Sequence, residues 1–179
     1  MITNNKNYII LLIIDLILLS IGIYNQDLYY NNYSYYATFI KGYIYLLIIA
    51  FISGLLMAYI SNKLSNKKVS YIAFFSFIIS SIIPSTINQA TIIANIHILF
   101  AYFGFGLSIL FNLINLYYYH IYNPKEAKKF IIIFMFIIFI SLYFFLDKMM
   151  VNFISEYIYT TGILINNTYL FFNKVKKKM

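Results

Sequence analysis

The sequence predicts an all-α bundle of six transmembrane helices, with both ends of the chain in the cytoplasm. Hydrophobic residues make up 63% of the 179 residues and charged residues only 10%, against about 45–50% and about 25% in ordinary globular chains. The apolar residues form six runs, most of them near the roughly 20 residues that cross a bilayer as a helix. The lysines lie in short clusters between these runs. A water-soluble domain is therefore excluded.

The six runs form one predicted domain that spans residues 1–179. We place them at residues 8–24, 40–60, 70–84, 92–119, 130–146 and 154–172. The first run follows Lys6 as a signal peptide would, but no small-residue cleavage site follows Gly22, so we expect a retained helix, with a cleaved signal as the alternative. The third run is short and stops at Pro84. We expect either a kink there, with the helix continuing to about Asn88, or a smaller tilt than that of its neighbours. The fourth is long, and its last turns should reach the interface.

The lysines predict the orientation. With the N-terminus inside, eleven of the thirteen lysines fall on the cytoplasmic side, and only Lys41 and Lys148 fall outside. Cytoplasmic loops of membrane proteins carry such an excess of positive charge. The alternation of basic and lysine-poor loops also predicts an even number of crossings.

The charge and the scarce ligand types limit the partners. The net charge is +8 and the pI is about 9.4, yet the chain has no arginine for bidentate base contacts, so we expect no nucleic-acid partner. Cysteine is absent and there are two histidines, so neither a metal site nor a cofactor is predicted. The expected partners are membrane lipid and either another membrane protein or a second copy of the chain.

Three ionisable residues fall within predicted spans, namely Asp15, His97 and Glu156. An ionisable residue at membrane depth is costly and marks a candidate functional site. We expect that all three could face an outward-opening cavity with Asp15 at its floor. The alternative for Asp15 is a neutral carboxyl bonded to a neighbouring helix. The alternative for Glu156 is an ion pair with Lys41 or Lys148.

Small and polar residues recur on one face of the fourth run. This face consists of His97, Ala101, Gly104, Ser108, Asn112 and Asn115. Such a stripe lets neighbouring helices approach closely and hydrogen-bond, which predicts a packing seam. A proton-handling or ligand-contacting role for His97 is the alternative. Shorter seams occur at Ala50, Gly54 and Ala58, at Ala73, Ser76 and Ser80, and at Glu156, Thr160, Ile163 and Asn167.

The order of these features resembles a family of small six-helix bacterial integral membrane proteins classed as a domain of unknown function. The matching residues are Tyr33–Tyr36 in the first outer loop, Pro84, His97 with Ala101, and Glu156. The Ser-Asp-Leu-Gly stretch of that family is replaced here by Ala37-Thr38-Phe39-Ile40. The resemblance implies fold and topology only. The tyrosine-rich loop 25–39 suits the headgroup layer, with a lid over the cavity as the alternative.

Three functional hypotheses follow. The first is a non-enzymatic membrane protein that binds or moves a small molecule or lipid at the outward-facing polar cavity. The second is an intramembrane lipid-acting enzyme that uses His97 with Glu156 or Asp15 for acid–base chemistry. The third is an accessory subunit of a larger membrane complex without a site. The expected location is a bacterial cytoplasmic membrane.

Overall fold

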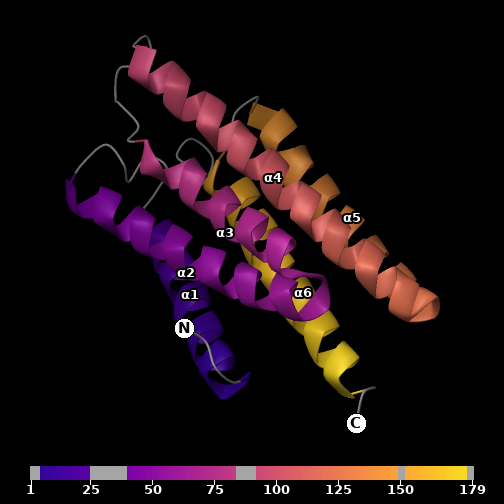
Figure 1. The fold of residues 1–179 in the computed structure, drawn as a ribbon. Coiled ribbons are helices and arrows are strands. Elements are labelled where there is room, and N and C mark those ends of the chain that lie inside the picture. The colour runs from indigo at the N-terminus through magenta and orange to yellow at the C-terminus, as the bar shows by residue number, and fades with distance from the viewer. Residues whose placement is uncertain (1–4, 25–39, 84–91, 149–151, 177–179) are drawn as a thin grey trace.

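The computed structural model describes residues 5–24, 40–83, 92–148 and 152–176, and all regular structure in these segments is helical (Figure 1). The helices are α1 (Asn5–Tyr24), α2 (Ile40–Leu64), α3 (Lys67–Ile82), α4 (Ile92–Tyr122), α5 (Pro124–Lys148) and α6 (Phe153–Lys176). The predicted all-α fold is confirmed. The tyrosine-rich loop 25–39 and Pro84 lie outside the described residues.

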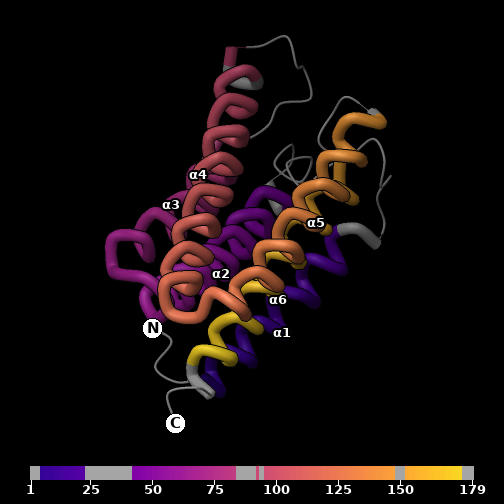
Figure 2. The backbone as a smooth tube through the Cα atoms, turned by 90° about the vertical axis from the view of Figure 1, so that its right-hand side faces the viewer, coloured from indigo at the N-terminus to yellow at the C-terminus, as the bar shows by residue number. Residues whose placement is uncertain are grey.

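Helices that follow one another in the chain run in opposite directions. The contacts that establish this are Tyr59 with Asn5, Tyr45 with Leu18, Tyr43 with Ile82, His97 with Ile83, Asn66 with Tyr118, Asn152 with Phe144, and Asn166 with Phe130. Only Asn123 separates α4 from α5. The start of α1 and the end of α6 therefore lie toward the same end of the bundle, as the tube view also shows (Figure 2).

Asparagine side chains cap the N-terminal ends of three helices. The Asn66 side chain accepts a hydrogen bond from the Val69 N–H at 3.0 Å and caps α3. Asn123 accepts in the same way before α5, and Asn152 exchanges hydrogen bonds with Ser155 before α6. These caps satisfy N–H groups that have no partner within the helix. They allow the short α2–α3 and α4–α5 connections to reverse the chain.

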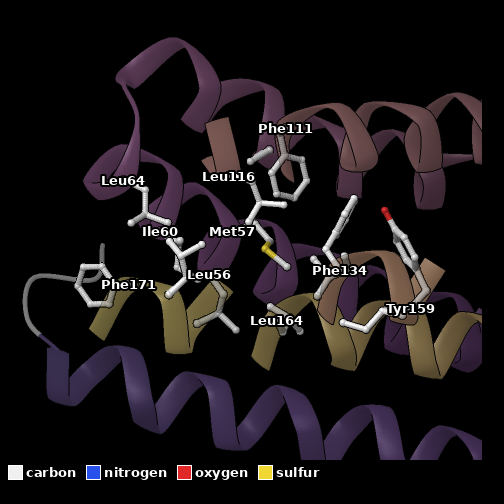
Figure 3. Packing of buried hydrophobic residues seen from close by; sticks show 14 of the residues in the cluster. Leu56, Met57, Ile60, Leu64, Phe111, Leu116, Phe134, Tyr159, Leu164 and Phe171 are labelled. Carbon is white, nitrogen blue, oxygen red and sulfur yellow. The ribbon is translucent and has the colours of Figure 1, made fainter. Parts of the chain in front are cut away.

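The distribution of side chains is the reverse of that in a water-soluble protein. Among the described residues, fifteen polar or charged side chains are buried, whereas the exposed surface of α1, α4 and α5 consists largely of Ile, Leu, Phe and Tyr. Apolar side chains such as Met57, Leu116, Phe134 and Leu164 gather between the helices (Figure 3). A surface of this kind is stable against hydrocarbon, where the outer face need not be polar.

Within the described residues, four of the six helices are long and apolar enough to cross a membrane. The segments are Asn5–Gly22 of α1, Gly42–Leu64 of α2, Asn95–Tyr122 of α4 and Pro124–Asp147 of α5. The six predicted runs thus correspond to six helices, and four of these meet the criterion for a membrane span. Helix α3 has only 16 residues. Helix α6 contains two adjacent asparagines, and it can carry them because α1, α2, α4 and α5 all contact it and bury most of its length.

Candidate functional site

Asp15 lies in the middle of the face by which α1 joins the bundle. The buried residues on this face are Tyr8, Asp15, Leu19 and Gly22, whose spacings of three, four and seven place them on one side of a helix. The Asp15 side chain is 0% exposed. Its Oδ2 accepts a hydrogen bond of 2.7 Å from the Ser53 hydroxyl on α2. Its Oδ1 is buried and has no hydrogen-bond partner among the described residues.

Other hydrogen bonds join α1 to α2 and α6 on both sides of Asp15 along the helix. They join Tyr8 to Thr168 at 2.5 Å, Ser20 to Tyr157 at 3.1 Å, Tyr59 to Asn5 at 3.1 Å, and the Tyr45 hydroxyl to the Leu18 carbonyl. The ring of Tyr8 also stacks on that of Tyr59, with centroids 5.3 Å apart. Helix α1 is therefore fixed at both ends, and Asp15 lies at a defined depth between these contacts.

His97 is buried at the α3–α4 interface. Its side chain is 4% exposed, and its Nδ1–H donates to the Ile83 carbonyl just after α3. Carbonyls at the end of a helix have no partner within it, so this bond satisfies one of them. Ile83 has φ −89° and ψ 118°, the extended conformation favoured before a proline. The contact gives His97 a structural role in holding the end of α3 against α4.

Glu156 is half-buried in the first turn of α6, where a negative charge interacts favourably with the helix dipole. The hydrogen bond of Asp15 goes to α2, and that of His97 goes to the end of α3. Neither of these two bonds involves Glu156. These two bonds therefore do not join Asp15, His97 and Glu156 into one site.

Gly104 marks the closest approach of α4 to α3. A Cβ atom at this position would lie 2.7 Å from the Ser76 backbone oxygen and 2.8 Å from the Ser80 Cβ. Only glycine allows the two backbones to come this close, as in other membrane helix pairs with small residues at the interface. Ala101 lies on the same face and is half-buried. The face predicted as a seam therefore packs against the predicted small-residue face of α3.

Further along the same face, α4 is hydrogen-bonded to α6 in the bundle interior. Ser108 bonds to the Tyr159 hydroxyl, and the Asn167 side-chain amide donates to the Asn112 oxygen. The Asn112 amide in turn donates to the Ser108 carbonyl at 2.7 Å. All four side chains are less than 5% exposed. This pairing explains why α6 carries polar residues at its centre.

Asn115 extends the polar contacts from α4 to α2. Its amide donates to the Ser61 hydroxyl at 3.0 Å, and its oxygen accepts from Ser65 at 2.9 Å. The seam on α4 thus contacts three helices in succession: α3 at Gly104, α6 at Ser108 and Asn112, and α2 at Asn115. It links elements that are distant in the sequence.

Ser53 and Tyr159 are among the partners that the sequence analysis missed. Ser53 directly precedes Gly54 of the predicted seam and lies near the middle of its run, as Asp15 does in the first run. Because consecutive helices are antiparallel, residues at mid-run lie at equal depth, and this signal could have paired them. Tyr159 is one of 20 tyrosines, and no pattern distinguishes it.

Within the described segments, no group of three or more His, Asp or Glu residues lies close enough together to hold a metal ion. A shallow groove runs along the outer side of α1. It is lined by Ile13, Leu16, Ile17, Ser20 and Ile21. These residues are mostly apolar, and several are exposed, so the groove suits an acyl chain better than a polar ligand.

Comparison of the chain with family models, with curated proteins and with solved structures gives no match. The resemblance to the six-helix family of unknown function therefore stays a prediction.

Proposed function

We propose that the chain is a multi-pass protein of a bacterial cytoplasmic membrane that takes up and releases a proton at Asp15. In this proposal, exchange at Asp15 moves a proton across the bilayer along the membrane potential. The proposal is a narrower form of the first hypothesis, a non-enzymatic protein that binds or moves a small molecule, with the proton as the species moved. Asp15 replaces the cavity of three residues as the centre of the site.

The observation that carries the proposal is the unequal environment of the two Asp15 oxygens. Oδ2 is held by Ser53, whereas Oδ1 is buried without a hydrogen-bond partner in the described part of the chain. A structural carboxyl that served only to join two helices would be expected to use both oxygens, because an unsatisfied buried polar atom costs about 1–3 kcal/mol. An oxygen left free can bind a proton, and intramembrane carboxyls commonly mark proton relays.

The orientation in this proposal has the lysine-rich end in the cytoplasm. Because consecutive helices are antiparallel, Lys6, Lys63–Lys68, Lys125–Lys129 and Lys174 all belong to helix ends at one end of the bundle. Lys41 and Lys148 belong to helix ends at the other. Positive charge of this kind is retained on the cytoplasmic side, which supports six crossings with both ends inside.

An accessory subunit without a site is the second candidate. It is favoured by the hydrogen bonds that interior side chains make with one another, such as Ser108 with Tyr159 and Asn112 with Asn167. The lipid-acting enzyme is favoured less, because Nδ1 of His97 bonds to a backbone carbonyl rather than to a carboxylate. Asp15 is the feature that separates the first candidate from the second.

The test measures proton flux in vesicles that contain the purified protein and a trapped pH-sensitive dye. A potassium gradient with valinomycin sets the membrane potential that drives proton entry. We expect proton flux above that of protein-free vesicles for the unmodified protein, and flux at the protein-free level for Asp15→Asn. Asparagine keeps an acceptor for Ser53 but cannot exchange a proton, so it separates the chemistry from the helix contact.

Glu156→Gln is the control, because it also removes one acidic group but lies in the first turn of α6. The proton flux of this variant should equal that of the unmodified protein. Gel filtration and thermal unfolding establish that each variant is folded. Equal flux for the unmodified protein and Asp15→Asn, or no flux from the unmodified protein, would contradict the proposal and favour the accessory subunit.

A further inference from the structure

Lysines from four helices meet at one corner of the bundle. They are Lys6 of α1, Lys63 of α2, Lys67 and Lys68 of α3, and Lys174 of α6. Two contacts bring these ends together. Tyr59 near the end of α2 donates to Asn5 at the start of α1, and the Lys174 ammonium donates to the Leu64 carbonyl at 2.8 Å. The fold therefore collects positive charges that are far apart in the sequence.

Within the described segments, no ion pair joins Lys6, Lys63, Lys67 or Lys68 to an acidic side chain. Asp15 is at mid-depth, and Asp147 and Glu156 belong to helix ends at the opposite end of the bundle. Glu126 is at the lysine-rich end, where its carboxylate bonds to Lys129 at 3.5 Å. Lysines within a Debye length of about 8 Å repel one another, so an external anion would stabilise the corner.

The surface below the corner is apolar and continuous with it. The Lys67 ammonium lies over the Tyr71 ring, 6.0 Å from its centroid, and Lys63 lies over Tyr59 at 5.8 Å. Tyr71 and Phe75 follow Lys67 at successive helical turns, and both are more than half exposed. A ligand at this position would meet positive charge at the helix ends and an apolar stripe along α3.

We propose that this corner binds the headgroup of an anionic phospholipid, with an acyl chain along Tyr71 and Phe75. The negative charge of such a headgroup complements the lysines, and polybasic groups at the membrane surface attract anionic lipid at about 1 kcal/mol per lysine. A free phosphate would use the lysines but not the exposed stripe on α3. The apolar stripe therefore favours a lipid as the occupant. This inference is independent of the function proposed for Asp15.

The test is native mass spectrometry of the purified full-length protein in detergent micelles doped with dioleoylphosphatidylglycerol or dioleoylphosphatidylcholine. We expect the unmodified protein to retain the phosphatidylglycerol and to retain little phosphatidylcholine. The triple variant Lys63→Gln, Lys67→Gln, Lys68→Gln should lose affinity for phosphatidylglycerol by about tenfold or more. Addition of inorganic phosphate in place of the lipid should give no comparable adduct.

A second triple variant is the matched control: Lys125→Gln, Lys128→Gln, Lys129→Gln. It removes the same charge from the α5 end, where Glu126 already offsets part of it, and it should keep most of the lipid binding. Single changes, Lys68→Gln against Lys128→Gln, give the same comparison if a triple variant does not fold. Equal losses in the two variants, equal retention of the two lipids, or equal binding of inorganic phosphate would each overturn the proposal.

Discussion

The Ser53 hydroxyl donates to the Asp15 carboxyl at 2.7 Å, and this bond joins α2 to α1 near the middle of both helices. It is the point at which the structural and the functional roles of Asp15 can be separated. Oδ2 contributes to helix packing through Ser53, and in the proposed function Oδ1 is the oxygen that takes up the proton. The stability of the bundle and the activity of the site should therefore respond differently to changes at these two residues.

Ser53→Ala should destabilise the protein by about 0.5–2 kcal/mol, the range of interhelical hydrogen bonds in membranes. The change removes the donor to Asp15 Oδ2, so that neither Asp15 oxygen has a hydrogen-bond partner among the described residues. Ser141→Ala is the control, because the Ser141 hydroxyl is buried but unpaired in the described structure; it should be neutral or slightly stabilising. Thermal or denaturant unfolding in detergent measures both. Equal effects would mean that the Ser53–Asp15 bond contributes nothing.

Gly104→Ala should destabilise the protein by roughly 1–3 kcal/mol, because the new methyl group would collide with the backbone of α3. Gly106→Ala, two residues further along α4, places its methyl group in open space. It should be neutral or stabilising, since alanine favours a helix over glycine by about 1 kcal/mol. Unfolding measurements on the pair test the α3–α4 seam. A Gly104→Ala variant as stable as Gly106→Ala would show that the helices do not approach closely there.

Asn112 and Asn167 should show energetic coupling in a double-mutant cycle. Their side chains bond to each other across the α4–α6 interface, and such pairs in membrane proteins contribute about 0.6 kcal/mol on average and at most about 1.7 kcal/mol. We expect Asn112→Ala and Asn167→Ala each to destabilise the protein, and the double variant to lose less than the sum. If the destabilisation of the double variant equalled the sum of the two single variants, the contact between Asn112 and Asn167 would be contradicted.

The number and order of the helices could be predicted from the sequence, because long apolar runs between basic clusters have few other solutions in a membrane. The polar face of α4 was predicted as well, since its residues recur at helical spacing. The partners of that face could not be predicted. The bond from Asn112 to Asn167 and that from His97 to Ile83 depend on how α4 packs against α6 and α3, and hydropathy carries no information on helix rotation.

All six runs were predicted as spans, but hydropathy does not show which of them is enclosed by the others. Asn166 and Asn167 lower the hydropathy of α6, yet they are 5% and 1% exposed. A helix surrounded by other helices tolerates such residues, whereas one that faces lipid does not. Only the packed bundle shows which helix is central.

The orientation can be tested by cysteine labelling, for which the chain offers a clean background because it contains no cysteine. Asn62→Cys near the end of α2 should react only with a membrane-permeant reagent. Asp147→Cys near the end of α5 should react with an impermeant reagent added outside intact cells. Both positions are exposed in the structure. External labelling at position 62 would reverse the proposed orientation.

Infrared difference spectroscopy of the protein in lipid, recorded while the pH is cycled, tests proton exchange at Asp15 most directly. A protonated carboxyl group in an apolar site gives a carbonyl band that a carboxylate lacks, and the band shifts when its proton is exchanged for deuterium. We predict a band that grows as the pH falls, disappears reversibly as it rises, shifts in heavy water and is absent from Asp15→Asn. A spectrum in which no band depends on Asp15, or in which the Asp15 band ignores pH and heavy water, would contradict a proton-exchanging site.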